Sequence, residues 1–512
     1  MIEVYKFGGV AVGTADAVRA AEKHVRDCKS HLVVIVSAMN GITDLLLDCA
    51  RAALAGDRET CRGAAETFES RHMQLVEELI DDQRVADELF AIVDGATAEM
   101  MSIADSIAVL RELTTRAQDA MVSRGERVLA RIFAACVNAT YVDASEVVFA
   151  ERRAGTLWPN FAKCERAAKK TILPLLDRTV VVVPGYLGSG PDGEVVTLGR
   201  GGSDFSAAIL ARSLNADAVT LWKEVDGLMT ADPRIVPSAR VLPELHYREA
   251  AELAFYGAKV LHPRTMIPLA DKKIPLLVRN TFREMGGTRI SADAQPGEYP
   301  VKALTAVPGQ ALISIEGSGM IGVPGVAART FGALAAAGHS VSMISQASSE
   351  SSICFVVPEV EAAHAVAALE EAFALERKMK FIDRIRAEKG VALIAVVGLG
   401  MRGRPGIAAR TFSALAAEHV NVHAIAQGSS ELNITATIAE DDVPRALRAL
   451  HAEYHLDKIR PLADTTSRES KVTFLGFGQI GRGLARQLAA QEKRLRADFG
   501  VDIKVIAVAD RS

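Results

Sequence analysis

The sequence has 512 residues, 49% of them hydrophobic, with 59 basic and 63 acidic side chains. This length predicts roughly three or four domains, and the net charge of −4 argues against a surface that binds nucleic acid. No apolar run reaches the ~18 residues needed to cross a membrane, and because the chain opens directly in a strand we expect no signal peptide. The cysteines have no C-x-x-C spacing, which predicts reduced thiols in a cytoplasmic protein and neither a disulfide nor a zinc site: Cys28, Cys49, Cys61, Cys136, Cys164 and Cys354.

A strand, a glycine turn and a helix open the chain. Residues 1–7 alternate between polar and apolar side chains, which predicts a strand, and Gly8 and Gly9 precede a helix that begins near Thr14. The free backbone amides of such a turn can bind phosphate. Lys6 lies at the strand end and is placed to meet phosphate charge, although a lysine at the edge of a sheet is more commonly only solvated.

A buried strand and a long helical block follow. Residues 31–37 (HLVVIVS) predict the strand, and residues 37–44 form a loop rich in hydroxyl and amide groups whose simplest role is helix capping. Residues 45–136 are expected to be almost wholly helical. Within them Gly125 costs a helix about 1 kcal/mol, which hints at a functional break. Residues 139–144 predict another strand, and the stretch to about residue 160 is expected to be irregular.

The most informative stretch is the glycine-dense loop over residues 197–208 (TLGRGGSDFSAA). A β-branched run over residues 179–184 predicts a buried parallel strand before it, and residues 205–214 predict a helix that starts at Ser203 or Asp204. A helix that follows a glycine loop presents free amides and a positive dipole to an anion. A tight turn with a helix cap is the simpler alternative.

A second group of polar residues follows the next strand, which is predicted over residues 218–222. The turn over residues 223–234 carries Lys223, Asp226 and Arg234 where a parallel sheet binds ligands, at the carboxyl ends of its strands. A helix over residues 247–256 comes next. Residues 276–280 are expected to close the domain, and residues 292–302 to form a linker.

An internal repeat occupies the next section. Residues 324–331 (PGVAARTF) recur 81 residues later as residues 405–412 (PGIAARTF), and residues 345–350 match residues 426–431. Each unit predicts a strand, a helix, two strands and a helix. Because the loop sequences repeat as well as the core, a ligand site between the two units is favoured over duplication for stability alone.

The last segment follows a polar linker over residues 463–470. It predicts a strand at 472–475, the sequence GFGQIG over residues 476–481, a helix to about residue 499 and a strand at 503–508. This context fits the opening of a dinucleotide-binding domain. The segment is too short to complete such a domain.

Six motifs in order make the chain resemble aspartate kinase over about residues 1–460. They are Lys6-Phe-Gly-Gly9, Ser37-Ala38 with Thr43, Gly125-Glu126, residues 197–208, Val225-Asp-Gly227 with residues 230–234, and residues 257–265 (GAKVLHPRT). The repeat resembles the paired ACT domains of that family. The last segment looks like the start of homoserine dehydrogenase, so the whole resembles a bifunctional aspartokinase/homoserine dehydrogenase cut short.

The resemblance implies an α/β fold class. We expect an amino-acid-kinase fold with three layers around a mostly parallel sheet over residues 1–295, and ACT-like α/β sandwiches over 305–385 and 386–462. A truncated Rossmann-type start, a partial NAD(P)-binding segment, would occupy 471–512.

The resemblance also implies an activity. It is ATP-dependent phosphorylation of the β-carboxylate of L-aspartate, with Mg²⁺, as the first step of lysine, threonine and methionine biosynthesis. Feedback regulation would act through the ACT domains, with threonine as the expected effector and a homo-oligomer formed through these domains. NADP would bind only if the dehydrogenase domain were complete.

The resemblance also implies roles for the individual residues that match the family's motifs. Lys6 would act on the transferring phosphoryl group and Asp204 would organise the site. The aspartate site would comprise Ser37, Thr43, Glu126, Arg200, Gly201, Gly202 and Ser203. The ATP site would comprise Lys6, Gly8, Gly9, Lys223, Glu224, Asp226, Met229, Arg234 and Lys259. Effector binding would fall to Gln346, Gln427 and Asn433, and the partial dinucleotide motif comprises Gly476, Gly478 and Gly481. No residue is expected to ligate a metal directly.

Two departures from the family pattern keep alternatives open. Val10 and Ala11 replace the Thr-Ser of the family's first motif, which removes two hydroxyls beside the phosphates, and Lys223-Glu224 replaces Thr-Asp. A catalytically weak amino-acid sensor is therefore a second hypothesis. A dehydrogenase is a third, which the incomplete last segment disfavours.

Overall fold

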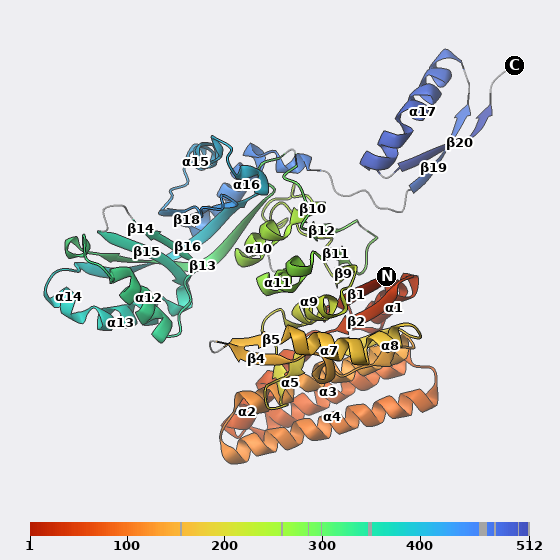
Figure 1. Cartoon of the computed structure of the whole chain (residues 1–512), viewed down its shortest axis with the longest axis horizontal. Helices are drawn as coiled ribbons and strands as arrows, with labels where there is room; N and C mark the ends of the chain where they lie inside the picture. The colour runs from red at the N-terminus through yellow and green to blue at the C-terminus, as the bar shows by residue number, and fades with distance from the viewer. Residues whose placement is uncertain are drawn as a thin grey trace.

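The computed structural model describes residues 1–153, 156–257, 260–284, 286–297, 299–346, 351–459, 468–475, 478–499 and 501–509. The first part is built on a sheet with the order β10-β12-β11-β9-β1-β2-β6-β3 (Figure 1). Every neighbouring pair is parallel except β11 and β12. Its strands are β1 (Ile2–Phe7), β2 (His31–Val36), β3 (Thr140–Tyr141), β6 (Val181–Pro184), β9 (Ala218–Lys223), β10 (Glu244–His246), β11 (Leu276–Asn280) and β12 (Thr288–Ser291).

Helices cover both faces of this sheet. Val33 and Ile35 of β2 belong to one core, while Leu32, Val34 and Val36 belong to the other, as expected for a strand whose side chains alternate between two buried faces. One layer comprises α1 (Ala15–Asp27), α2 (Ile42–Ala55), α3 (Arg58–Leu79), α4 (Gln83–Leu110) and α5 (Thr115–Cys136). The other comprises α7 (Phe161–Thr171), α8 (Leu173–Leu176), α9 (Gly202–Leu214), α10 (Tyr247–Phe255) and α11 (Pro263–Lys272). The predicted three-layer, mostly parallel architecture is confirmed.

Three local predictions differ from the structure. The stretch expected to be irregular contains α6 (Ala144–Val147) and a hairpin of β4 (Ala150–Arg153) and β5 (Thr156–Pro159). A second hairpin, β7 (Leu187–Ser189) with β8 (Val195–Thr197), separates the buried strand from the glycine loop. Residues 276–280 do not close the sheet, because β12 follows. Its four residues include Thr, Arg and Ser, so no hydrophobic alternation marks it.

The two repeat units share one antiparallel sheet, in the order β14-β15-β13-β16-β18-β17. The strands are β13 (Ala303–Glu316), β14 (Met343–Gln346), β15 (Ser352–Pro358), β16 (Arg384–Val397), β17 (Ala424–Ala426) and β18 (Asn433–Ala439). The helices are α12 (Val326–Ala336), α13 (Ala362–Ala372), α14 (Ala374–Lys378), α15 (Ile407–Ala417) and α16 (Val443–Glu453). The predicted pairing of two α/β units is confirmed, and the boundary expected at 385/386 lies inside β16.

The long strands β13 and β16 join the two units. Residues 310–316 of β13 pair with β15 and with residues 384–391 of β16, whereas residues 303–307 pair with residues 393–397 of β16. The C-terminal half of β16 also pairs with β18. The last described elements are β19 (Arg468–Leu475), α17 (Gln479–Phe499) and β20 (Val501–Ala509), and the two strands are parallel.

Candidate functional site

A cleft of about 1050 Å³ opens at the carboxyl ends of β1, β2 and β9. Parallel strands bring their ends to one edge of the sheet, so residues far apart in sequence meet there. The cleft is lined by eleven residues predicted for the site: Lys6, Gly9, Ser37, Thr43, Glu126, Arg200, Gly201, Gly202, Ser203, Asp204 and Lys223.

Two lysines pair with the carboxylate of Asp204 in the cleft. Lys6 Nζ lies 2.7 Å from Asp204 Oδ1, and Lys223 Nζ donates to Asp204 Oδ2 at 2.8 Å. Burial by itself would raise the pKa of Asp204, but the charges of Lys223 and Lys6 hold it well below its usual value. Burial lowers the pKa of Lys6, and Asp204 opposes this effect. The trio carries a net positive charge in a mostly buried setting, which suits an anionic ligand.

The glycine loop delivers the start of α9 to the cleft. Gly201 caps the helix with a φ of +72°, a left-handed conformation that favours glycine, and no side chain caps the helix. A Cβ on Gly202 would lie 2.4 Å from the Tyr186 ring, so a side chain cannot fit there. The helix therefore begins at Gly202, one or two residues earlier than expected, and its first amides face the cleft together with Asp204.

The first glycine turn packs tightly against the loop that follows β2. A Cβ on Gly9 would lie 2.8 Å from the carbonyl oxygen of Ala38, and the Asn40 amide donates to the Gly9 carbonyl oxygen at 3.2 Å. Gly8 lies beside Lys6, whose Nζ would be 3.6 Å from an added Cβ. The two phosphate-cradle candidates of the sequence thus share one cleft.

Glu126 is the unusual group of the predicted aspartate site. It is 3% exposed, and its Oε2 atom has no hydrogen-bond partner. Burial raises its pKa to about 8. Gly125 beside it leaves room for the start of α2 and for the loop before it, because a Cβ there would lie 2.9 Å from Ile42 and 3.0 Å from Ala38. The helix glycine singled out in the sequence thus serves close packing behind the cleft.

Most described residues predicted for the ATP site do not line the cleft. Asp226 accepts a hydrogen bond from Asn280 at 2.6 Å and lies 3.3 Å from Arg283, while the exposed Arg234 pairs with Asp232 in its own turn. Glu224 is exposed, Met229 bridges to Val241, and neither lines the cleft. Lys259 lies outside the described residues.

Several residues that line the cleft were not predicted. Tyr186, with a φ of +69°, stands beside Gly202, and His262 stands beside Gly201. Phe255 from α10 and residues 306–308 from β13 form another wall. Tyr186 has no motif signal, because its position depends on the β7–β8 hairpin. The sequence could not predict the wall from β13, because this wall depends on how the sheet of the repeat units packs against the first part of the chain.

The predicted effector residues take different positions. Gln346 ends β14 and Gln427 follows β17, and both are exposed. Asn433 instead donates to Glu252 of α10, in the first part of the chain. Of the dinucleotide motif, Gly478 and Gly481 lie at the start of α17, while Gly476 lies outside the described residues.

Other features of the described residues set limits on the chemistry. They contain no cluster of three or more His, Cys, Asp or Glu side chains that could hold a metal ion. None of their helices is both long and apolar enough to span a bilayer. All six cysteines are free thiols.

Two family models match this chain. The model of the amino acid kinase family matches residues 1–280, and that of the ACT domain matches residues 313–373 and 394–454. A chloroplastic bifunctional aspartokinase/homoserine dehydrogenase 1 of Zea mays is 36% identical over 99% of this chain and 55% of its own length. The chain therefore spans little more than half of that relative. An aspartokinase of Schizosaccharomyces pombe is 31% identical over 90% of this chain and 93% of its own length.

Solved structures agree with these relatives. E. coli aspartokinase III in complex with aspartate and ADP has a TM-score of 0.75 at 28% identity, over 89% of this chain and 100% of that chain. The same protein in complex with lysine and aspartate has a TM-score of 0.72, over 88% of this chain and 99% of that chain. From its N-terminal sheet to its paired ACT units, the chain belongs to the aspartokinases of the amino acid kinase family.

Proposed function

We propose that this chain phosphorylates the β-carboxylate of L-aspartate with ATP and forms 4-phospho-L-aspartate. The observation that carries the proposal is the pairing of Lys6 and Lys223 on Asp204, in one cleft with Arg200 and Glu126. The complex of E. coli aspartokinase III with aspartate and ADP supports both substrates. The first step of lysine, threonine and methionine biosynthesis is the role that follows.

The chemistry needs charge neutralisation rather than a base. A carboxylate nucleophile with a pKa of about 4 is already ionised at neutral pH, so the difficulty is to bring two anions together. Lys6 would neutralise the transferring phosphoryl group, and the amides at the start of α9 would add donors. Asp204 is held ionised between two lysines, which suits the positioning of Lys6 and Lys223 and not the acceptance of a proton.

The other wall of the cleft suits an amino acid. Arg200 can bind the α-carboxylate through two parallel hydrogen bonds, and the unpartnered oxygen of Glu126 can accept the α-ammonium. Ser37, Thr43 and Ser203 line the same cleft and can donate to carboxylate oxygens. Gly201 and Gly202 contribute backbone only.

ATP would lie toward Gly8, Gly9 and Lys223, with Glu224, Asp226, Met229, Arg234 and Lys259 as its proposed outer contacts. Mg²⁺ would be held mainly by phosphate oxygens and water, because Asp204 already pairs with two lysines. When bound, Mg²⁺ would offset phosphate charge.

A coupled assay of ADP release at millimolar aspartate and ATP tests the proposal. We expect turnover by the parent, and a loss of about a hundredfold or more in kcat for Lys6→Met, because a charge on the reacting group is removed. Lys23→Met is the matched control, since Lys23 lies on the exposed face of α1 and pairs with Glu284. No turnover by the parent chain would contradict the proposal.

Glu126 offers a second, independent test. Since burial holds its pKa at about 8, it is mainly protonated at pH 7 in the free cleft. Pairing with the aspartate ammonium would ionise it, so aspartate binding would release up to about one proton. Calorimetry in buffers of different ionisation enthalpy would measure this release, and Glu126→Gln would abolish it. Proton-neutral binding by the parent would contradict this role.

The paired ACT units suit feedback control by an amino acid, with Gln346, Gln427 and Asn433 as proposed contacts. Threonine is the proposed effector, although E. coli aspartokinase III has been solved with lysine. Threonine that lowers activity in the coupled assay, where lysine does not, would support this assignment. Assembly through the ACT units is also proposed, and a stable monomer by light scattering would contradict it.

One observation favours an amino-acid sensor with little catalysis. Val10, which is 42% exposed beside the glycine turn, and the buried Ala11 offer no hydroxyl to phosphate. Threonine or lysine binding by calorimetry, together with absent phosphotransfer, would select the sensor.

We propose that the chain comprises a kinase domain over residues 1–295, two ACT-like domains over 305–385 and 386–462, and a partial NAD(P)-binding segment over 471–512. The β19–α17–β20 unit is proposed as the opening of an NAD(P)-binding domain of homoserine dehydrogenase type. A cytoplasmic location is proposed because all six cysteines are free thiols.

A further inference from the structure

A second cavity, of about 290 Å³, lies between α4 and α5 and shares no lining residue with the cleft. Three arginines of α5 line it, at positions 124, 127 and 131. A spacing of three and then four residues places them on one helical face. Opposite them α4 presents Ala91, Gly95 and Ala96, whose small side chains leave the space open. Glu126 of the same helix lines the cleft instead, so α5 separates the two hollows.

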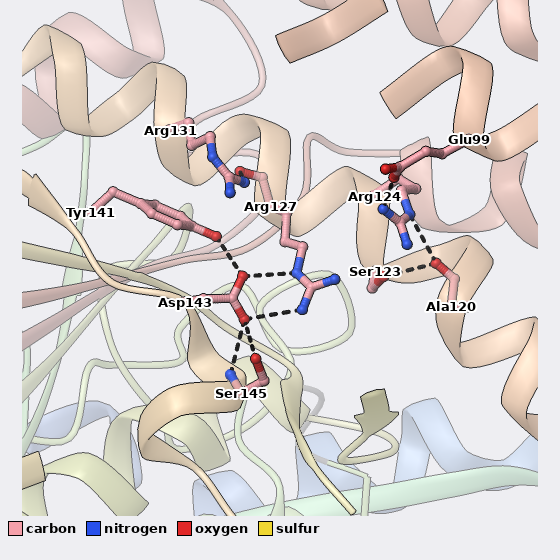
Figure 2. A network of polar contacts seen from close by, with 9 residues as sticks. All are labelled: Glu99, Ala120, Ser123, Arg124, Arg127, Arg131, Tyr141, Asp143 and Ser145. Carbon is pink, nitrogen blue, oxygen red and sulfur yellow. Dashed lines mark hydrogen bonds and ion pairs between the residues drawn. The ribbon is translucent and has the colours of Figure 1, made fainter. Parts of the chain in front are cut away.

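Arg127 is held by a full ion pair. Its Nε and Nη2 atoms donate to the two carboxylate oxygens of Asp143 at 2.8 and 3.0 Å (Figure 2). Tyr141 Oη and the Ser145 amide and hydroxyl also donate to Asp143. Burial by itself would raise the pKa of Asp143, but the donors from Arg127 and Ser145 hold it well below its usual value. This pair is satisfied and contributes no net charge.

Arg124 is neutralised at the other end of the cavity. It pairs with Glu99 of α4, and its Nε donates to the Ala120 carbonyl oxygen at 3.2 Å. Both arginine side chains are mostly covered, with 18% of Arg124 and 17% of Arg127 exposed. Glu99 is 61% exposed, so water screens the Arg124 pair, whereas the Arg127–Asp143 pair is covered on both sides.

Arg131 has no such counter-ion. Its guanidinium lies 4.1 Å from the centre of the Tyr141 ring and donates to the Arg127 carbonyl oxygen at 3.3 Å. In the described part of the chain no carboxylate lies within ion-pair distance of it. Three cations thus face two anions, Glu99 and Asp143, which leaves the cavity with one net positive charge.

We propose that this cavity binds a small oxyanion on Arg131, between the Tyr141 ring and the small-residue face of α4. Guanidinium donors form a planar fork that matches the oxygens of phosphate and carboxylate. Stacking on Tyr141 fixes the plane of the Arg131 fork, so little side-chain entropy is lost on binding. The two satisfied ion pairs frame the site, and its volume of about 290 Å³ is ample for an ion of the size of phosphate.

The test must separate this site from the cleft, which also attracts anions. We therefore use a chain with both Lys6→Met and Arg200→Gln as background, since Lys6 and Arg200 are the proposed phosphate and carboxylate contacts of the cleft. Inorganic phosphate is titrated at constant ionic strength, with chloride as the balancing anion. Binding is followed by thermal unfolding and calorimetry. We expect saturable stabilisation by phosphate in this background. The inference does not depend on kinase activity, because no turnover is measured.

Arg131→Gln, added to this background, should weaken phosphate binding about tenfold or more, because a charged donor pair is lost. Arg131→Lys keeps the charge without the fork and should give an intermediate loss. Arg116→Gln is the matched control, since Arg116 is exposed on the same helix, outside the cavity. Phosphate binding that is absent in the background, or unchanged by Arg131→Gln, would overturn the proposal.

A crystal soak and a second anion provide further tests. If Arg131→Gln does not fold, selenate soaked into crystals of the parent should give an anomalous peak within hydrogen-bond distance of Arg131, and no peak there would overturn the proposal. Succinate in place of phosphate identifies the source of the oxyanion. Arg131-dependent binding of succinate alone would assign a carboxylate ligand, and Arg131-dependent binding of phosphate alone would assign a phosphate.

Discussion

The two repeat units have similar internal bonds and different neighbours. In the first, Arg329 pairs with Glu376 and lies 4.7 Å from the Phe373 ring centre. In the second, Arg410 pairs with Glu453 and lies 4.9 Å from the Tyr454 ring centre. The repeated arginine thus makes the same aromatic contact and the same bond to a carbonyl oxygen, of Ala372 and of Glu453, while its acidic partner lies on α14 in the first unit and on α16 in the second.

At two equivalent positions of the repeat, only the second unit bonds to helix α10 of the first part of the chain. The Leu399 amide donates to Glu249 at 2.6 Å, and Asn433 donates to Glu252. The equivalent positions in the first unit are Ser318 and Ser352, and neither bonds to the kinase part in the described residues. The second unit is therefore coupled to α10 through side chains that the first unit does not match, whereas the first unit meets the end of α10 through β13, where Thr305 donates to the Tyr256 carbonyl oxygen.

Breaking the Glu249 contact should have the largest effect. Glu249 is fully buried and also accepts from Lys302 Nζ at 3.1 Å, so Glu249→Gln leaves a buried ammonium unpaired. We expect a loss of about 3–5 kcal/mol in the free energy of unfolding in urea.

The matched control in the first unit is Glu361→Gln, because Glu361 pairs with His339 at a more exposed site and should cost less than about 1 kcal/mol. Removing both charges with Glu249→Met and Lys302→Met should recover only part of the loss, because the Leu399 and His246 amides lose their acceptor. A single Glu249→Gln effect no larger than the control would show that docking does not need this ion pair.

Asn433→Ala should come next in size. It deprives the Glu252 carboxylate of a donor, which costs about 1.5–3 kcal/mol for a bond to a charged group. Ser352→Ala, at the equivalent position of the first unit, should cost less than about 0.5 kcal/mol. Thermal unfolding of both variants checks this, and equal shifts would mean that the two units are not distinguished by docking.

His451 should make the docked unit sensitive to acid. It is 2% exposed, its Nε2 lies 2.9 Å from Thr230 Oγ1, and Glu370 stands at the equivalent position of the first unit. Burial lowers the pKa of His451, with Asp457 opposing and Arg240 reinforcing the shift.

A buried neutral histidine stabilises fully above its unfolded pKa of about 6.5, and this contribution falls as pH drops toward the folded pKa. His451→Gln should therefore flatten the decline of urea stability between pH 7.5 and 5.5. His72, which burial shifts to a pKa of about 4, remains in both chains as a common background. An unchanged decline would contradict the role of His451.

The repeated arginines should give the smallest effects. Arg329→Gln and Arg410→Gln each remove a half-exposed ion pair, with 50% and 43% of the side chain exposed, so each should cost at most about 1 kcal/mol. Urea unfolding should give equal losses within about 0.5 kcal/mol. Unequal losses would show that docking also strengthens the arginine contacts of the second unit.

The sequence predicted the parts of the site that follow from strand ends and glycine loops. Lys6, Arg200 and Asp204 line one cleft because parallel strands deliver their ends to one edge. It did not predict that Lys223 would pair with Asp204, nor that Asp226 and Arg234 would bond within their own neighbourhood.

The remaining differences are long-range. Tyr186 reaches the cleft through a hairpin without a strong strand signal, and residues 306–308 reach it only because the regulatory sheet packs beside α10. Local pattern carries no information on such packing. The docking of Asn433 on Glu252 is of the same kind, since neither residue marks the other in sequence.

The strands β13 and β16 have a further consequence for the regulatory units. One half of each strand pairs with strands of its own unit. The other half pairs with the long strand of the other unit. Deleting either repeat unit would therefore leave an edge strand of the other unit without its partner and expose a row of unpaired peptide groups. We therefore expect the two copies to unfold together as one cooperative block, since neither sheet half keeps its pairing without the other.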